Sequence, residues 1–399
     1  MKRRTALKAA VAASAIVWAG AAFAADPIIV GAVAPKTGGL AGGSVVTHWP
    51  NIQLWAGEVN ARGGLNVGGE MRLVEVIEYD DQTNPAETIK AITRLATQDN
   101  ADIILAPYST GLNIAAAPIM DKLGFPQITS TAATDQVGEL SKQFPNMYFL
   151  LGSSSALANG AVNVMAEMRD KGEIGSRIAM VNVADAFGIE LAAVAKPSFE
   201  AAGFEIVYET SYPLGTQDLS PIMKAAKAAE PDAFVAWFYP PDTFGLIEQA
   251  MIEDLNVKVF YTAVATAFPA YSAVFGPAAE GVMGIGGVNN GSADFLDYAA
   301  RHEAATGQKP DYWASGMMYA SLQILEQSIE ASGTLDMAVI NQYIKVHSFE
   351  TVMGTIDFDE NNNNASYWTV GQWQGGEFRG IASTGRDGAV APVLKNGWK

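Results

Sequence analysis

Short apolar runs alternate with amphipathic stretches along the first part of this chain. The run Pro27–Ala34 is rich in β-branched and small apolar residues, which is typical of a buried parallel strand. Trp49–Ala61 has helical spacing and ends before two glycines. Arg72–Tyr79 alternates as a strand, and the amphipathic stretch Pro85–Asp99 precedes another buried run at Ala101–Ala106. This order of strand, helix and strand predicts βαβ units and a mainly parallel sheet.

The same alternation restarts near residue 177 and predicts a second α/β lobe. The strands expected there are Arg177–Val183, Phe204–Tyr212, Ala233–Phe238 and Val257–Thr262, and the helices are Ile189–Ala202, Ser220–Ala229 and Thr243–Asp254. Further helices are expected at Phe295–Thr306, Tyr312–Ser332 and Leu335–His347, and a tail rich in strands and turns follows from Thr355. No Pro/Ser-rich linker separates the two series, so structured crossings should join the lobes.

The N-terminus predicts export. Four basic residues lie within the first eight, an apolar run extends from Ala9 to Ala22, and the small-x-small pattern Ala22-Phe23-Ala24 follows. This is the pattern of a secretory signal peptide cleaved after Ala24, and the run is too short for a stable membrane span. The alternative is a membrane anchor or a buried helix. Arg3-Arg4 also resembles a weak twin-arginine signal, so the exporter stays open.

Charge and cysteine content exclude several classes of partner and site. The net charge is −17, and residues 1–24 hold four basic and no acidic residues, so the mature chain carries −21. Nucleic acid and anionic membranes would repel such a protein, and no second long apolar segment predicts membrane insertion. The chain has no cysteine, which excludes disulfides and thiolate metal sites. Its length of 399 residues favours two domains.

Motifs for cofactors and metals are incomplete. No glycine-rich loop is followed by Lys-Ser or Lys-Thr, and Gly284–Asn289 lacks the third glycine of a dinucleotide fingerprint, so we interpret it as a crossing between lobes. The oxygen-bearing residues of Asp357–Asn363 have calcium-loop spacing, but Asn362 stands where glycine is required and Trp368 where the closing glutamate is required. An Asx-rich hairpin turn is the favoured interpretation. We therefore expect no cofactor and no metal.

The carboxyl ends of the predicted strands carry the most informative residues. They offer hydroxyls, backbone amides before helices, and aromatic rings; the ends are 34–39, 106–111, 128–134, 184–188 and 237–241. Ligands of open parallel α/β sheets bind beyond the carboxyl ends of strands, and helix N-termini suit a carboxylate. The alternative is that Ser109, Thr110 and Thr134 only cap helices and turns. The convergence of five such ends favours a ligand site.

Seven short stretches, in this order and spacing, resemble one known family over nearly the whole mature chain. They are Ile29–Gly38, Glu58–Leu65, Tyr79–Pro85, Ala115–Pro118, Ile128–Thr134, Ala279–Gly281 and Thr351–Gly354. The chain resembles the periplasmic solute-binding proteins of ABC importers, specifically the branched-chain amino acid (Leu/Ile/Val-binding) type.

The resemblance implies an α/β protein of the type I periplasmic binding fold. Two Rossmann-like lobes with parallel central sheets would be joined by three hinge crossings, near 149–152, 282–286 and 354–355. Residues 1–24 would be the signal peptide. Lobe 1 would comprise 25–150 plus 285–354, and lobe 2 would comprise 151–284 plus 355–399.

The resemblance also implies where the ligand binds. Thr110, with Ser109 beside it, and then Ala132 and Thr134 would hold a ligand carboxylate, while Tyr239 would close from lobe 2. Phe187, Val264 and Trp49 complete the expected site.

Two departures affect the ligand. Val264 stands at the position where the family commonly has an acidic residue for a ligand ammonium, and the loop Gly42–Trp49 carries the unusual residues His48 and Trp49. An apolar residue at 264 favours an acid without an α-amine, either aromatic or short aliphatic. The open alternative is that Asp185 or Asp242 takes the ammonium role.

The sequence thus predicts a periplasmic, monomeric solute-binding protein that is not an enzyme. It would capture a small carboxylate ligand in an inter-lobe cleft and deliver it to the membrane permease of an ABC importer. The first alternative is that the ligand is a branched-chain or other amino acid. The second is a ligand-sensing subunit or an exported α/β enzyme, although the sequence lacks the motifs that such an enzyme requires.

Overall fold

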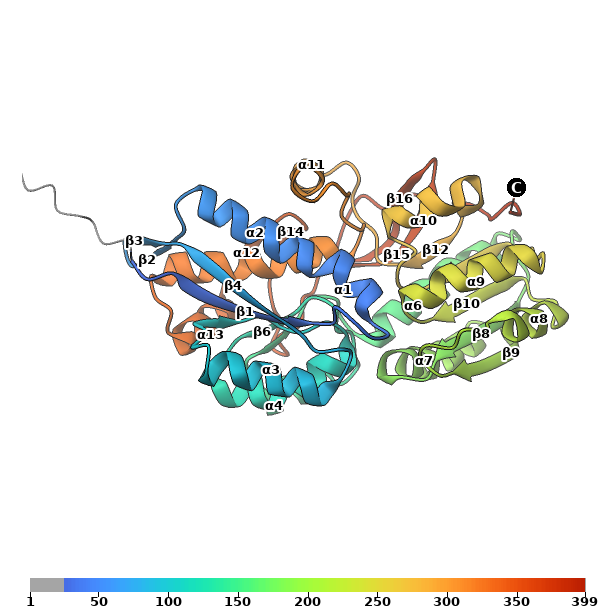
Figure 1. Cartoon of the computed structure of the whole chain (residues 1–399). Coiled ribbons are helices and arrows are strands. Elements are labelled where there is room, and N and C mark those ends of the chain that lie inside the picture. The colour runs from blue at the N-terminus through green and yellow to red at the C-terminus, as the bar shows by residue number, and fades with distance from the viewer. Residues whose placement is uncertain (1–24, 399) are drawn as a thin grey trace, which may run out of the picture.

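The computed structural model describes residues 25–398 and divides into two lobes that lie side by side along the long axis of the molecule (Figure 1). The predicted signal peptide lies outside the described residues. Lobe 1 here means the elements packed around β1, and lobe 2 the elements packed around β8.

Lobe 1 is built on short parallel strands. β1 (Ile28–Ala34) lies between β4 (Val74–Asp80) and β5 (Ile103–Ile104), and β6 (Gln127–Thr129) pairs in parallel with β7 (Met147–Phe149). β1 is almost entirely apolar because helices cover both faces of the sheet.

The helices of lobe 1 come from two separate parts of the chain. They are α1 (Ala41–Thr47), α2 (Trp49–Ala61), α3 (Pro85–Thr97), α4 (Thr110–Leu123), α5 (Val137–Gln143), α11 (Ala293–Thr306), α12 (Ala314–Ser332) and α13 (Met337–Val346). Two hairpins complete the lobe: β2 (Leu65–Val67) with β3 (Glu70–Arg72), and β13 (Phe349–Thr351) with β14 (Gly354–Ile356). Because α12 packs on α2, residues far apart in sequence share one core.

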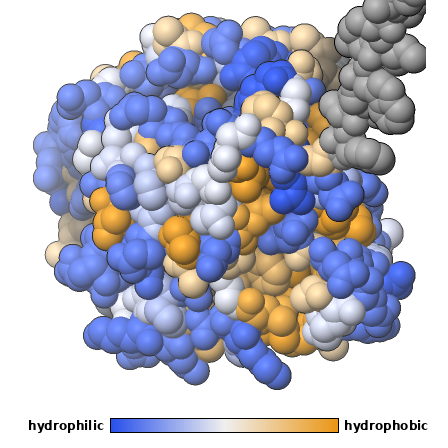
Figure 2. Space-filling view, turned by 90° about the vertical axis from the view of Figure 1, so that its left-hand side faces the viewer, coloured by the Kyte–Doolittle hydropathy of each residue, from blue (hydrophilic) through white to orange (hydrophobic). Residues whose placement is uncertain are grey.

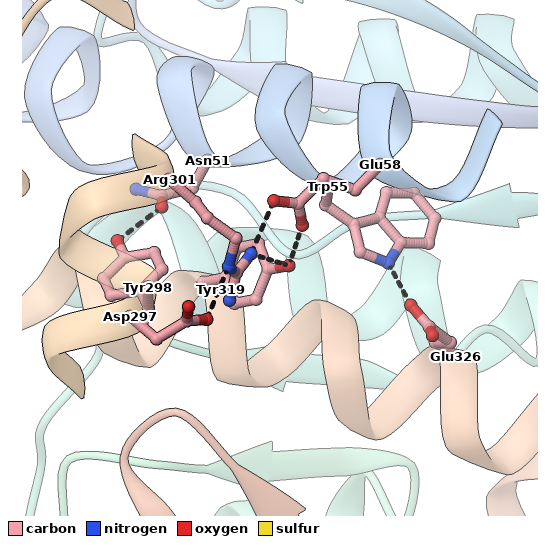
Figure 3. A network of polar contacts seen from close by, with 8 residues as sticks. All are labelled: Asn51, Trp55, Glu58, Asp297, Tyr298, Arg301, Tyr319 and Glu326. Atoms are coloured by element: carbon pink, nitrogen blue, oxygen red, sulfur yellow. Dashed lines mark hydrogen bonds and ion pairs between the residues drawn. The ribbon is translucent and has the colours of Figure 1, made fainter. Parts of the chain in front are cut away.

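A polar network ties α2, α11 and α12 together (Figure 3). Arg301 of α11 donates to Glu58 of α2, to Asp297 at 2.8 Å and to the Tyr319 hydroxyl of α12 at 3.2 Å. Tyr319 in turn donates to Glu58. Every charge in this group therefore has an opposite charge or a hydroxyl beside it.

Lobe 2 is built on one seven-stranded sheet. Its strand order is β16 (Glu377–Thr384), β15 (Tyr367–Gln374), β12 (Met283–Ile285), β11 (Val259–Thr262), β10 (Ala233–Trp237), β8 (Arg177–Val183) and β9 (Glu205–Tyr212). The last five run in parallel, whereas β15 is antiparallel to both of its neighbours, β12 and β16. The helices of this lobe are α6 (Ser154–Asp170), α7 (Ala186–Ala201), α8 (Ser220–Ala228), α9 (Pro240–Ile252) and α10 (Pro269–Phe275), followed by the short 3₁₀ helix η1 (Gly276–Ala279).

The chain passes between the lobes at three places. The first passage follows Phe149, and the second lies between β12 and α11, where Gly286 has φ +92° and a side chain there would collide with Trp313. The third passage runs alongside the first, because Phe149 pairs with the segment Asn362–Asn364 before the chain enters β15. The expected third crossing at 354–355 instead lies in the β13–β14 hairpin, which packs on α12.

The segment expected as a loop at Gly42–Trp49 is mostly helical. α1 occupies Ala41–Thr47, and α2 follows directly. A Cβ at Gly43 would lie 2.0 Å from the Tyr108 hydroxyl, so only glycine lets α1 lie on the end of β5. The tertiary contact thus overrides a sequence with two adjacent glycines and low helix propensity.

The predicted Asx-rich turn is confirmed. The Asp359 carboxylate accepts from the backbone N–H groups of Asn361 at 2.8 Å and Asn363 at 3.0 Å. Those contacts use the oxygen that a calcium loop would direct at a metal.

The surface of the lobe 1 end is mostly hydrophilic, with smaller hydrophobic groups between the polar residues (Figure 2). Within residues 25–398, no helix combines the length and apolar character needed to cross a membrane. The large apolar side chains are mainly in the two lobes' cores.

Candidate functional site

Ser109 begins α4 with a strained backbone. Its φ of 75° and ψ of 157° fall in a region that is almost restricted to glycine, yet serine occupies it. The Ser109 hydroxyl accepts from the Leu112 N–H at 3.4 Å, and the Ser109 N–H donates to the Thr131 hydroxyl at 3.0 Å. Strain of this kind is commonly retained at binding sites, where the conformation presents a side chain or a backbone N–H to a ligand.

Thr110 fixes the neighbouring loop of lobe 1. Its hydroxyl donates to the Ala133 carbonyl and accepts from the Ala133 N–H, both at 3.2 Å. The Ser154 hydroxyl donates to the same carbonyl at 3.2 Å. Ala132 lies in the same loop and is fully buried. The structure therefore brings Ser109, Thr110 and Ala132 together, and the Thr110 hydroxyl is engaged within its own lobe.

Phe187 and Tyr239 form the facing wall from lobe 2. Their ring centres are 5.3 Å apart, and each residue lies just beyond a strand of the seven-stranded sheet. The Tyr239 hydroxyl lies beside Asp185 of its own lobe and Ser109 of lobe 1, but it makes no hydrogen bond of normal geometry. Burial, and then the nearby Asp185, raises the pKa of Tyr239 well above its ordinary value. The phenol is therefore a neutral donor with a free position.

Two carboxyl groups, a half-buried one on Asp185 and a buried one on Asp242, lie close to Tyr239. Asp185 caps α7 by accepting from the Gly188 N–H at 2.8 Å, and burial raises its pKa. Asp242 is 2% exposed, and burial raises its pKa to about 6, with Asp185 adding to the shift. Its Oδ2 atom and the adjacent Tyr212 hydroxyl lack a partner of good geometry. Buried groups of this kind usually have a partner, and here the Tyr212 hydroxyl and the Asp242 carboxyl are each other's nearest candidates.

Thr134 makes a contact across the two lobes. Its hydroxyl donates to Glu190 of α7 at 3.0 Å, and the Asp135 N–H donates to the same carboxylate oxygen. The described structure is thus a closed arrangement, because α4 also packs on α7 and α1 on α9.

Val264 and Trp49 lie in different lobes, Val264 after β11 of lobe 2 and Trp49 at the start of α2 in lobe 1. Val264 follows β11, is buried, and accepts at its carbonyl from the Thr243 hydroxyl; Ala265 after it has φ +70°. Trp49 covers the end of β1, where its indole N–H donates to the Pro35 carbonyl at 3.4 Å and Lys36 lies 4.5 Å from the ring centre. Those contacts hold Trp49 against the core of lobe 1.

All eight predicted site residues are buried, and most lie at the boundary between the lobes. Sequence reasoning missed Glu190, which lies on α7 one turn from the strand end and carries no motif. It also missed Tyr212, which ends β9 and carried no signal beyond its position at a strand end. The site offers hydroxyls, backbone amides and aromatic rings on one side and carboxyl groups on the other.

The three histidines do not join this group. The ring centres of His48 and Tyr108 are 5.4 Å apart in an edge-to-face arrangement. Burial lowers the pKa of His48 to about 4, so the imidazole is neutral at pH 7. His302 lies on α11 and His347 after α13. Over residues 25–398, no three His, Asp or Glu side chains gather as a metal centre would require.

Comparison with known proteins identifies the family and the fold. A sequence model of the periplasmic binding protein family matches residues 27–377. An amino acid binding protein of Pseudomonas aeruginosa is 22% identical over 370 residues, which cover 91% of this chain and 94% of that protein. The Leu/Ile/Val-binding protein homolog 7 of Brucella suis is 24% identical over 385 residues, covering 91% and 93%.

Solved structures share the fold. A solute-binding protein of an ABC transporter from Rhodopseudomonas palustris, in complex with 3,4-dihydroxybenzoic acid, has a TM-score of 0.77 at 22% identity over 92% of this chain and 99% of that one. A branched-chain amino acid transporter substrate-binding protein from Streptococcus pneumoniae, in complex with isoleucine, has a TM-score of 0.77 at 19% identity over 90% and 99%. The predicted α/β fold with two lobes is thereby confirmed.

Proposed function

Because the chain belongs to the periplasmic binding protein family, as a solute-binding protein of the branched-chain amino acid type, we propose that it captures a small carboxylate-bearing ligand between its lobes. It then delivers the ligand to a membrane permease. In this proposal the mature protein begins at Ala25, works in the periplasm as a monomer and catalyses no reaction.

The observation that carries the proposal is the meeting of Ser109 and Tyr239. A serine held in a strained conformation at the start of α4 faces a tyrosine of the other lobe whose hydroxyl has no satisfactory partner. A carboxylate placed between them would accept from the Ser109 and Tyr239 hydroxyls and from amides of the 130–134 loop. Charge-assisted hydrogen bonds of this kind are stronger than neutral ones, so they favour the closed form.

The rest of the ligand is proposed to be an amine-free aromatic or short aliphatic acid. Val264 supports this class because its apolar side chain offers no charge for an ammonium group. The rings of Phe187 and Tyr239 supply an apolar wall that suits such a ligand.

An amino acid is the second candidate, and one specific observation favours it. The half-buried Asp185 lies close to the buried Asp242, and the Asp242 Oδ2 atom has no partner. A ligand ammonium would offset the cost of ionising these carboxyl groups.

Titration calorimetry with matched ligands tests the proposal. Leucine is compared with 4-methylpentanoate, and phenylalanine with 3-phenylpropanoate and benzoate, so that each pair differs in the amine. Binding by at least one carboxylate, together with contraction of the particle in X-ray scattering, supports capture by closure. If no carboxylate produces heat or contraction, the proposal is wrong.

Asp185→Asn and Asp242→Asn then separate the two ligand classes. An amine ligand should bind at least tenfold more weakly to the variants, because its charge partner is lost. An amine-free acid should bind equally well or more tightly, because a repelling carboxylate is gone. Lys90→Gln, at an exposed pair on α3, is the control and should change neither affinity.

A further inference from the structure

A cavity of about 410 Å³ lies at the hinge between the lobes. Its walls come from the second passage, at Val288–Ser292, from the β13–β14 hairpin and from the segment after β16. None of the eight predicted ligand-site residues lines it. Any ligand here would contact parts of the chain that connect the two lobes.

Arg386 in the wall of this cavity is a cation without a counter-charge. Its Nη1 atom donates to the Met353 carbonyl, while Nε and Nη2 are buried and have no partner among the described residues. Burial alone lowers the pKa of Arg386 to about 10, since no carboxylate compensates. Guanidinium groups keep their charge at neutral pH, so this charge is partly buried and has no ion-pair partner among the described residues.

Other donors line the same cavity. The indole Nε1 of Trp368, which is 1% exposed, is buried and also lacks a partner. Ser292, which caps the 14-residue helix α11, also lines the wall, and Asp294 in the first turn offsets part of the positive charge of this helix end. The one acid in the lining, Asp387, is exposed and forms no ion pair with Arg386 within the described chain. The cavity wall thus holds one cation without an ion pair and a second donor without a partner.

We propose that this hinge cavity is a second binding site, for a small oxyanion, in which the Nε and Nη2 atoms of Arg386 and the indole of Trp368 donate to the anion. The planar guanidinium fork matches the two oxygens of a phosphate or carboxylate. Because Arg386 also holds the Met353 carbonyl, a bound anion would tie the C-terminal segment to the β13–β14 hairpin. This site is independent of the proposed ligand cleft, so either can fail alone.

Thermal unfolding of the mature protein tests the site. Phosphate and sulfate form one arm and acetate and citrate the other, each titrated at constant ionic strength against sodium chloride. Binding to the folded state raises the melting temperature along a saturating curve, whereas general salt stabilisation does not saturate. We expect a saturating rise in at least one arm, and its absence from both would overturn the proposal.

Three variants locate the binding. Arg386→Gln should weaken the apparent anion affinity at least tenfold, and Arg94→Gln, at a half-exposed ion pair in lobe 1, should leave it unchanged. Trp368→Phe keeps an aromatic ring but removes the indole donor, so it should cause a smaller loss of anion affinity. It tests the site if Arg386→Gln fails to fold. Carboxylate binding whose affinity is unchanged in Thr134→Ala belongs to the hinge rather than to the ligand site between the lobes. If Arg386→Gln binds the anion as tightly as the wild-type protein does, the anion binds elsewhere and the assignment is wrong. If only Trp368→Phe folds, the same result for that variant refutes the assignment.

Discussion

Two arginines of this protein have opposite surroundings. In Arg301, burial by itself lowers the pKa, but Asp297, Glu58 and Tyr319 outweigh it and the pKa is raised (Figure 3). Arg386 has only the Met353 carbonyl, and its pKa falls. The first network is complete and joins three helices of lobe 1. The second is incomplete and lies where the lobes meet.

The same contrast separates the scaffold from the ligand cleft. Glu58 has donors from two helices, whereas Asp242 and Tyr239 at the lobe boundary retain atoms without a partner. Complete polar networks fix a structure, because removing one member leaves the others buried and unpaired. Incomplete networks between moving parts are open to a ligand. The comparison therefore predicts stability effects at the first kind of site and affinity effects at the second.

The largest expected effect is on the complete network. Arg301→Met removes three contacts and leaves Glu58 and Tyr319 without their shared donor, so the free energy of unfolding should fall by about 2–3 kcal/mol. Ligand affinity should change little. Urea unfolding measures the loss, with Lys90→Gln as the exposed control. A loss equal to that of the control would show that the network does not stabilise lobe 1.

The next largest effect is expected on the hydrogen bonds that would hold the ligand carboxylate. Ser109→Ala and Thr134→Ala each remove one hydrogen bond to a charged group, so each should weaken ligand binding tenfold or more, or about 1.4 kcal/mol. Ser109→Ala should also lower the free energy of unfolding by about 1 kcal/mol, because the Ser109 hydroxyl caps α4. Thr110→Ala should lower stability as well, because the Thr110 hydroxyl holds the Ala133 backbone. Normal binding by both Ser109→Ala and Thr134→Ala would show that the site lies elsewhere.

The elements that the sequence predicts correctly depend on local pattern. β8 and α2 match the expected ranges to the residue, because apolar periodicity and flanking glycines determine them. α1 and the third passage depend on tertiary contacts, with Tyr108 and Phe149 respectively, which no local pattern encodes. Secondary structure set by distant packing is therefore where sequence reasoning fails.

The candidate site divides in the same way. The strand-end rule found Ser109, Thr134 and Tyr239, because chain position alone brings strand ends to one edge of a sheet. It could not find the Glu190 contact, which exists only because two lobes close on each other. Roles within the cleft remain predictions for all eight residues.

The pH dependence of affinity sharpens the comparison between ligand classes. Burial and Asp185 raise the pKa of Asp242 from 3.8 to about 6, so the empty folded protein holds this proton more tightly than the unfolded chain does. This group's contribution to stability therefore falls as the pH rises from about 4 to about 6. A ligand ammonium requires ionised Asp242, so amine affinity should rise up to about tenfold between pH 5 and pH 7. Affinity for an amine-free acid should stay level or fall.

Calorimetry in two buffers of different ionisation enthalpy measures the proton released on binding. Asp242→Asn is the matched variant and should abolish the dependence of amine affinity on pH. If the affinity of Asp242→Asn still depends on pH in the same way, the released proton comes from another group.

The smallest expected effect concerns Glu190, which already occupies a donor of the carboxylate site. Its carboxylate accepts from the Thr134 hydroxyl and the Asp135 N–H, and an incoming ligand carboxylate would need the first of these donors. Glu190→Gln keeps the size of the side chain but removes its charge, so it is a weaker competitor and a weaker repellent. Ligand affinity should therefore rise about threefold, or roughly 0.6 kcal/mol, and the slower dissociation should be visible in stopped-flow fluorescence. Glu167→Gln, at an exposed ion pair on α6, controls for the loss of one negative charge. A fall in affinity would instead identify Glu190 as a latch that stabilises the closed form, because the variant would lose a contact that only closure makes.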